Sequence, residues 1–396
     1  MPPTAGATAF TARISRISIS ATMAVSIEAA TLRSEGADLV EFGAGEPHFT
    51  TPEHIKRAAI EAIQQNFTKY TPVAGIKELR EAVTARHKQD FGSDYSFDEC
   101  IVTTGGKNAL FNTFSVLIDH GDEVIIPTPY WVSFRDIVEY CGGKCAFVAT
   151  HAEDGFRLTA AMIEKAITPR TRIILLNTPH NPTGAVVAPE DLTAIVKLAA
   201  SRGILVMSDE CYVYLDYTGR PFSIGVLKEN KDSLLLMGSL SKTYSMTGWR
   251  LGYALAPKAV VTQLQKLQSQ STSNPTSISQ KAALAALTAS QQCVADVRAG
   301  YIQLRDRMVA GLRSIPGVKV TFPEGAFYAF PDVSEIAARA GINTTELASR
   351  LLHEGHVVTV PGEAFGLPGY IRCSYTTPLG EIDRGLERMR AFFAAL

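Results

Sequence analysis

The sequence predicts an α/β fold, with a mostly parallel seven-stranded-type sheet sandwiched by helices and a smaller α+β domain. Between about Ile101 and Ala256, seven short runs rich in β-branched residues alternate with helical patterns. Several runs are continuously apolar, which is typical of strands that helices bury on both faces. After about residue 290 the rhythm changes to shorter strands among amphipathic helices, which indicates a second architecture.

The seven expected strands belong to a large domain that we assign to residues 51–290. In chain order they read IVTTGG, DEVIIP, CAFVAT, RIILLN, ILVMSD, SLLLMGS and GYALA. Helices fit between them: the segment from Pro189 to Arg202 begins with Pro-Glu-Asp and ends before a glycine, as helices commonly do. After Lys258 a long helix-rich stretch is interrupted at Asn274-Pro275.

The smaller domain is assigned to residues 291–396. It contains the expected strands VKVTFP, FYAFPD, VVTVPG and YIRCSY, with amphipathic helices around 344–354 and 379–395. Residues 14–50 are expected to pack on this domain, because a helical pattern (Ala24 to Glu35) precedes the strand-like LVEFGAG. Residues 1–13, which are small and polar, are expected to form a flexible extension.

Composition excludes several classes of function. The chain has 396 residues, 46% of them hydrophobic, and a net charge of −1. It therefore has no long-range field to gather nucleic acid or an anionic membrane. We find neither a signal peptide nor an apolar run of membrane-spanning length, and expect a cytoplasmic protein. The six cysteines form no CxxC pair and are expected to be reduced, and no ligand spacing predicts a metal.

Four polar segments follow strands, where open α/β sheets bind their ligands. They are TTGGKNALF, NTPHNPTG, SDECY and SLSKTYSMTGWR. In this order and spacing they resemble the class I aminotransferases of the fold-type I pyridoxal-phosphate superfamily, specifically the bacterial aspartate aminotransferase branch. The resemblance runs from about Ile14 to the C-terminus. It implies pyridoxal 5′-phosphate as cofactor, L-amino acids and 2-oxo acids as substrates, and a large domain that binds the cofactor.

The lysine of the last segment, Lys242, is predicted to be the catalytic residue and to carry the cofactor as a Schiff base. A lysine that follows small residues at the end of a strand can be enclosed in a site where its amine forms an imine with an aldehyde. The turn at Gly105, Gly106 and Lys107 opens a helix, so its free N–H groups form a phosphate seat. Arg250 can meet the same phosphate bidentately.

The resemblance adds the other cofactor contacts. Ser239 and Ser241 are implied as further phosphate donors, and Asp209 as the carboxylate that keeps the pyridine nitrogen protonated. Tyr212 and Asn181 match the positions that hydrogen-bond the ring's phenolic oxygen, and Trp131 the aromatic that stacks on the ring. Tyr70 matches a tyrosine that reaches the phosphate of the neighbouring subunit, which implies a homodimer with shared active sites.

Substrate recognition is also implied by the resemblance. Arg372 in YIRCSY corresponds to the arginine that clamps the substrate α-carboxylate, and the backbone of Gly45 closes over it; Trp131 and Asn181 also reach the substrate. Lys107 corresponds to the lysine that binds a distal carboxylate, which makes aspartate and 2-oxoglutarate the expected pair in a ping-pong transamination. Branch members that accept prephenate carry a lysine where this chain has Ser18, which argues against prephenate.

Two alternatives stay open at this point. The same cofactor and fold also support β-eliminases, decarboxylases and cyclopropane-forming synthases, as well as aminotransferases of other specificity. A cofactor-sensing regulator would need a DNA-binding segment ahead of the enzyme-like part, and only some dozen residues precede it. His180, beside Asn181, is interpreted as a supporting residue rather than a base, because the Schiff-base lysine already serves as one.

Overall fold

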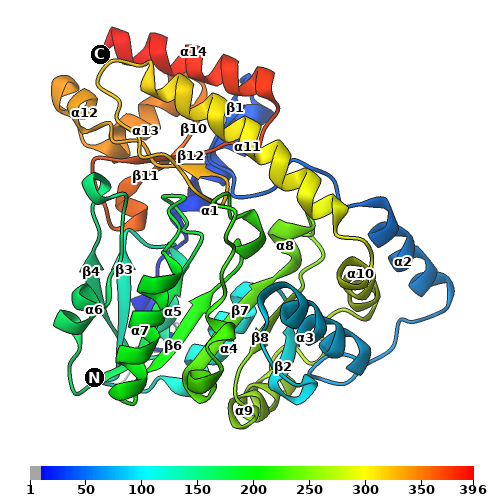
Figure 1. Ribbon diagram of the computed structural model, residues 1–396. Coiled ribbons are helices and arrows are strands. Elements are labelled where there is room, and N and C mark those ends of the chain that lie inside the picture. The colour runs from blue at the N-terminus through cyan, green and yellow to red at the C-terminus, as the bar shows by residue number, and fades with distance from the viewer. Residues whose placement is uncertain (1–9) are drawn as a thin grey trace, which may run out of the picture.

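A computed structural model describes residues 10–396, whose largest sheet has seven strands (Figure 1). These strands are β2 (Cys100–Thr103), β3 (Glu123–Thr128), β4 (Lys144–Ala149), β5 (Thr171–Asn177), β6 (Leu205–Asp209), β7 (Leu234–Ser239) and β8 (Gly252–Leu255). They lie in the order β2-β8-β7-β6-β5-β3-β4, and every pair is parallel except the two that involve β8. The predicted fold class and all seven predicted strands are confirmed. Residues 1–9 of the expected flexible extension lie outside the described residues.

Helices bury the sheet on both faces. One face is covered by α4 (Gly106–Leu117), α5 (Ser133–Tyr140) and α9 (Lys258–Ser269), and the other by α3 (Lys77–Phe91), α6 (Ala160–Ala166), α7 (Pro189–Ser201) and α10 (Ser277–Thr288). A further helix, α2 (Glu53–Gln64), packs against α10. On β6, Val206 faces the second group and its neighbour Met207 faces the first, and both are fully buried. Burial on both faces explains why the strands read as continuous apolar runs.

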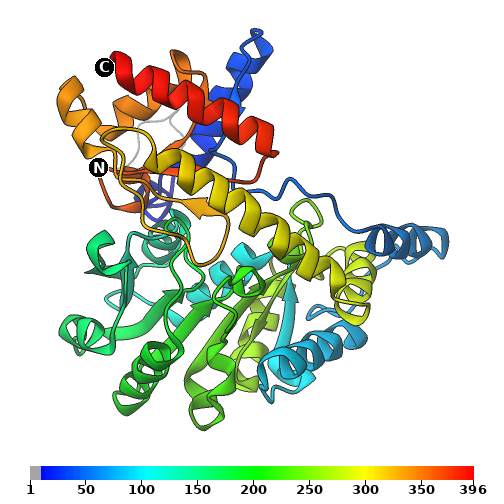
Figure 2. The same ribbon diagram turned by 45° about the horizontal axis from the view of Figure 1, so that its top comes forward.

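The chain's second unit lies above the sheet in Figures 1 and 2. Its strands are short: β1 (Val40–Glu41) pairs in parallel with β10 (Val357–Val358), and β11 (Val360–Pro361), β12 (Ile371–Ser374) and β9 (Tyr328–Ala329) form a three-stranded sheet. Around them lie α1 (Ala21–Ser34), α11 (Gln292–Arg313), α12 (Ser334–Ala340), α13 (Thr344–His353) and α14 (Leu379–Ala395). The N-terminal segment is joined to the C-terminal part through the β1–β10 pair.

One predicted strand, VKVTFP, is wrong. The segment contributes only an isolated antiparallel bridge between Lys319 and Asp332. It ends at Pro323, which has no N–H to donate to a ladder. The predicted boundary at residues 290 and 291 falls just before α11, which contributes Val294 to the core of the sheet and Tyr301 to the core of the second unit. The division into 51–290 and 291–396 therefore stays a prediction.

Four strands of the large sheet, β2, β5, β6 and β7, have their carboxyl ends on the same side of the sheet. Because β2 and β7 both run antiparallel to β8, while β5, β6 and β7 are parallel, their carboxyl ends point the same way. The strands end at Thr103, Asn177, Asp209 and Ser239. This edge faces the second unit, as the location of a ligand site in open α/β sheets requires. Within residues 10–396 no helix is both long and apolar enough to cross a membrane.

Candidate active site

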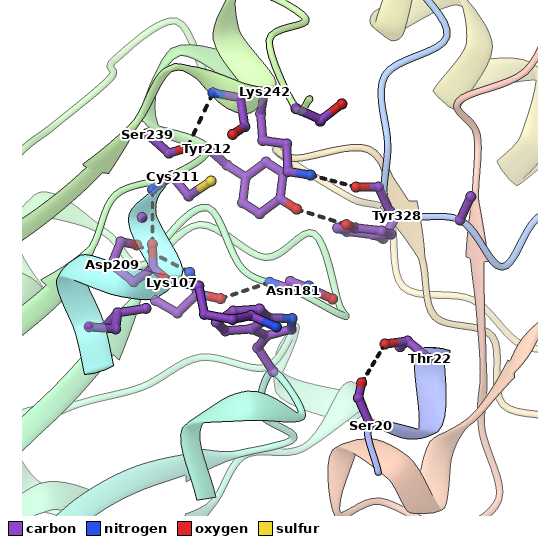
Figure 3. Close-up of a pocket in the computed structure, with 18 of the residues that line it drawn as sticks. Ser20, Thr22, Lys107, Asn181, Asp209, Cys211, Tyr212, Ser239, Lys242 and Tyr328 are labelled. Carbon is purple, nitrogen blue, oxygen red and sulfur yellow. Dashed lines mark hydrogen bonds between the residues drawn. The ribbon is translucent and has the colours of Figure 1, made fainter. Parts of the chain in front are cut away.

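A cavity of about 420 Å³ lies between the sheet edge and the second unit (Figure 3). Twelve of the fourteen predicted site residues line it: Gly45, Gly106, Lys107, Trp131, Asn181, Asp209, Tyr212, Ser239, Ser241, Lys242, Arg250 and Arg372. The other two do not. Gly105 lies behind Arg250, and Tyr70 is 90% exposed.

Lys242 lies in α8 (Leu240–Thr243), a short helix that directly follows β7. The Ser239 hydroxyl caps this helix by accepting a hydrogen bond from the Ser241 N–H at 3.2 Å. The Lys242 ammonium donates to the carbonyl of Gly45 at 2.5 Å, across the cavity (Figure 3). Burial is the largest cause of a lowered pKa of Lys242, and the positive charges of Arg372 and Arg250 lower it further. A lysine with a lowered pKa is a better nucleophile and base near neutral pH.

An anion seat forms where α4 begins. Gly105 is the N-cap of α4 and has φ 85° and ψ 160°, a region that residues other than glycine rarely enter. A Cβ atom on Gly105 would lie 2.5 Å from Nη2 of Arg250, and one on Gly252 would lie 2.3 Å from the Gly106 nitrogen. The glycines therefore let a helix N-terminus and a guanidinium approach the same place, which suits a phosphate.

Asp209 is a buried carboxylate without a cation. Its side chain is 7% exposed and accepts one hydrogen bond, from the Cys211 N–H at 3.1 Å. Within the described chain no basic side chain forms a salt bridge with it. Burial raises its pKa to about 7, with the Cys211 hydrogen bond opposing the shift and the charge of Glu210 adding to it. The protonated pyridine nitrogen of pyridoxal 5′-phosphate would supply the cation that this carboxylate lacks.

Arg372 is a buried guanidinium that forms no salt bridge with any side chain of residues 10–396. It is 2% exposed, and it donates to the Gly43 carbonyl at 2.7 Å and to Oδ1 of Asn181 at 3.0 Å. Its guanidinium carbon lies 4.5 Å from the centre of the Tyr328 ring, and its Nε has no partner among the described residues. An arginine in this state fits a carboxylate ligand.

Three aromatic side chains, Tyr212, Tyr328 and Trp131, complete the cavity wall. The Tyr212 hydroxyl lies 2.7 Å from that of Tyr328, and burial raises the pKa of Tyr212 well above its ordinary value. Trp131 also lines the cavity, with the Lys107 ammonium 4.9 Å from its ring centre. Burial, and then the charge of Arg250, lower the pKa of Lys107.

Several residues that line the cavity were not predicted. They are Ser20, Thr22, Met23, Ser26, Gly43, Ala44, Leu110, Asn177, Cys211, Thr247 and Tyr328. Tyr328 meets Tyr212 across 116 positions of sequence, so no local pattern points to it. Ser20 and Thr22 precede the helical pattern expected from Ala24, and in the structure, where α1 begins at Ala21, their hydroxyls lie 2.8 Å apart.

His180 does not line this cavity. It is half-buried and lines a second, smaller pocket, where its Nδ1 lies 2.7 Å from the Thr183 hydroxyl. Burial lowers its pKa to about 4, so the ring is neutral near pH 7. Across residues 10–396, no three His, Cys, Asp or Glu side chains gather as a metal site.

At the edge of this sheet a half-buried lysine lies with a carboxylate and an arginine that form no ion pair among residues 10–396, and this arrangement is typical of an aminotransferase-type enzyme. Comparison with known proteins supports this class. The family model described as aminotransferase class I and II matches residues 37–389, and the chain belongs to that family.

The relatives cover nearly the whole chain. An aspartate aminotransferase from Geobacillus stearothermophilus is 42% identical over 386 residues, which are 97% of this chain and 98% of that protein. A probable aspartate/prephenate aminotransferase from Rhizobium leguminosarum bv. phaseoli is 41% identical over 391 residues, which are 96% of this chain and 98% of that protein. A solved structure of aspartate aminotransferase from Thermus thermophilus with maleate has a TM-score of 0.93 at 42% identity and covers 97% of this chain and 100% of that one. The predicted resemblance is confirmed.

Proposed function

We propose that the protein is a pyridoxal 5′-phosphate-dependent aminotransferase that moves the amino group of an L-amino acid, aspartate first, to 2-oxoglutarate in a ping-pong reaction. The observation that carries the proposal is the meeting of Lys242, Asp209 and Arg372 in one cavity. When bound, the cofactor supplies an aldehyde for an amine and a ring that accepts the electrons released at the substrate Cα. The names of the relatives above support aspartate as a substrate.

Each end of the cofactor has matching residues. The N–H groups at Gly105, Gly106 and Lys107 and the side chains of Ser239, Ser241 and Arg250 would hold the phosphate. Asp209 would keep the ring nitrogen protonated, because a carboxylate beside that nitrogen stabilises its positively charged form. Tyr212 and Asn181 would donate to the phenolic oxygen, and Trp131 would cover one ring face.

Lys242 is the residue that moves the proton. Its Nζ is held at the cavity wall by the Gly45 carbonyl, and its lowered pKa leaves more of the amine unprotonated near neutral pH. We assign it both the attachment of the cofactor and the removal of the Cα proton. Reduction of the holoenzyme with borohydride should mark the Lys242 peptide, and Lys242→Ala should abolish that mark. If borohydride still fixes the cofactor covalently to a normally folded Lys242→Ala protein, the proposal is wrong.

Substrate binding would use two cations. Arg372, with Asn181 beside it, would hold the α-carboxylate, and the backbone of Gly45 would close over it. Lys107 would bind the distal carboxylate of aspartate, with Trp131 as the wall between them. The family resemblance implies a lysine near the position of Ser18 in members that accept prephenate, so we propose that prephenate is not a substrate.

The test of specificity is a screen of amino donors with Lys107→Ala. We expect kcat/KM for aspartate to fall about 10- to 100-fold, the value of one charge-assisted contact, with little change for alanine. Lys258→Ala is the matched control, because Lys258 pairs with Asp98 on the surface. Equal losses for both donors would contradict the role of Lys107. Release of ammonia or carbon dioxide without transfer of the amino group to 2-oxoglutarate would instead favour a lyase or a decarboxylase.

The active unit would be a homodimer. Tyr70 is 90% exposed, and Ile60 and Ile63 on α2 are 50% and 53% exposed, so a second copy would bury apolar surface and bring Tyr70 to the phosphate of its neighbour. Light scattering should give twice the chain mass of 42.8 kDa. A monomer with full activity would contradict the shared site.

A further inference from the structure

Glu41, the last residue of β1, holds the backbone that enters the candidate active site. Its Oε1 accepts hydrogen bonds from the N–H group of Gly43 at 3.0 Å and from that of Ala44 at 2.9 Å. Gly43 and Ala44 line the cavity, whereas Glu41 does not. The proposed function gives Glu41 no role.

The backbone hydrogen bonds between strands of the second unit end at Phe42. Its N–H donates to the Val358 carbonyl at 3.0 Å, and its carbonyl accepts from the Ser374 N–H at 2.7 Å. Among residues 10–396, the two N–H groups that follow have no backbone acceptor, and Glu41 supplies one to both. A carboxylate thus replaces the strand partner that these N–H groups lack.

One peptide unit links Glu41 to Arg372. The carbonyl of Gly43 and the N–H of Ala44 belong to the same trans peptide, so they point in opposite directions. Glu41 accepts from the N–H at 2.9 Å, and Nη2 of Arg372 donates to the carbonyl at 2.7 Å. An anion bound to the N–H polarises the peptide and makes its carbonyl a stronger acceptor for the guanidinium. Both the position and the strength of the contact with Arg372 therefore depend on Glu41.

Few other groups orient Arg372. Its Nη1 donates to Oδ1 of Asn181 at 3.0 Å, and its Nε has no partner among residues 10–396. In this part of the chain, the Gly43 carbonyl is thus one of two hydrogen-bond acceptors for a guanidinium that is only 2% exposed. Because water cannot replace a lost acceptor at a buried donor, the orientation of Arg372 is sensitive to the loss of one.

The second oxygen of Glu41 faces a more exposed partner. Oε2 lies 2.6 Å from Nη2 of Arg33, on α1, and the side chains of Arg33 and Glu41 are 42% and 30% exposed. Arg33 can turn to water if this ion pair is lost, whereas the N–H of the buried Gly43 cannot. A neutral side chain with one acceptor oxygen at position 41 would therefore direct that oxygen to the backbone.

We propose that Glu41 is a positioning residue of the substrate site: it fixes the peptide between Gly43 and Ala44, and this peptide orients Arg372 toward the α-carboxylate of the substrate. The inference rests on the proposed function, because it needs Arg372 at that carboxylate. Arg372 would hold the carboxylate in the ground state and in the transition state alike. Loss of the acceptor oxygen should therefore raise KM and change kcat little.

The test compares Glu41→Gln with Glu41→Met in the enzyme loaded with pyridoxal 5′-phosphate. Both variants remove the charge and the ion pair with Arg33, but glutamine keeps an acceptor oxygen, whereas methionine has only a weakly accepting sulfur. The probe is succinate, a dicarboxylate without an amino group, and calorimetry measures its Kd. We expect Glu41→Met to raise this Kd about 10-fold, the effect of one hydrogen bond to a charged group. Glu41→Gln should raise it only about 2-fold.

Two further measurements distinguish positioning from a general loosening of the cavity. The affinity for the cofactor, followed by near-visible absorption, should be the same in both variants, and Glu41→Met should raise KM for aspartate with little change in kcat. Glu354→Met is the matched control, because Glu354 pairs with Arg350 on the surface and accepts from no backbone N–H among residues 10–396. It should leave the succinate Kd unchanged.

The results distinguish the role of Glu41 from the proposed function. An unchanged succinate Kd in Glu41→Met, an equal increase in Glu41→Gln, or a matching loss of cofactor affinity would overturn the role of Glu41 and leave the proposed function intact. If the unmodified, loaded enzyme binds no succinate, the proposed dicarboxylate site is overturned, and this inference with it. If Glu41→Met does not fold, Glu41→Ala, which also lacks the acceptor oxygen, decides in its place.

Discussion

Replacing Gly105 with alanine tests the anion seat most directly. The backbone at Gly105 has φ 85° and ψ 160°, and placing a side chain there costs about 1–3 kcal/mol. The new Cβ would also lie 2.5 Å from Nη2 of Arg250. The guanidinium would have to withdraw by about 1 Å to reach ordinary van der Waals contact.

A shift of that size breaks a bidentate contact with a phosphate. Hydrogen bonds to charged groups contribute about 1.5–3 kcal/mol, so we expect Gly105→Ala to weaken pyridoxal 5′-phosphate binding about 10- to 150-fold. The assay is a titration of the apoprotein with the cofactor, followed by near-visible absorption. Thermal unfolding of the same samples measures the loss of stability.

Gly121→Ala is the matched control. Gly121 has φ 96°, but a Cβ there would meet no atom within 4 Å. It should lose stability through backbone strain and bind the cofactor as the unmodified protein does. If Gly105→Ala binds the cofactor as tightly as Gly121→Ala, Arg250 does not hold the phosphate, and the reasoning is refuted.

Two further predictions concern the buried charges. Because the pKa of Asp209 rises from 3.8 to about 7 on folding, the apoprotein should lose stability as the pH rises from about 4 to about 7, and Asp209→Asn should remove this dependence. The substitution should stabilise the apoprotein at pH 8 by about 2–4 kcal/mol; a thermal midpoint that Asp209→Asn leaves unchanged at pH 8 would contradict this. Arg372→Lys should lower kcat/KM for amino acids about 10- to 150-fold and spare the cofactor's absorption, because lysine cannot reproduce the guanidinium fork. An equal loss for a primary amine without a carboxylate would argue against the clamp.

The sequence alone was enough to predict the large sheet and most of the residues that gather at its edge. Strands such as ILVMSD are apolar along their whole length because they are buried on both faces, and this leaves a pattern that is local in the chain. Lys242, Asp209 and Arg250 follow or end such strands in recognisable segments. Their types and their positions at strand ends were therefore predictable before any contact was known.

The tertiary structure decided what depends on distant segments. The strands of the second unit are only two to four residues long, so their pattern is weak, and VKVTFP fails because its pairing depends on Asp332 and ends at Pro323. Tyr328 joins the site through Tyr212, and the Gly43 carbonyl meets Arg372 across 329 positions of sequence. A sequence pattern reports burial and backbone preference, which are local, whereas the partner of a buried charge is set by how remote elements pack.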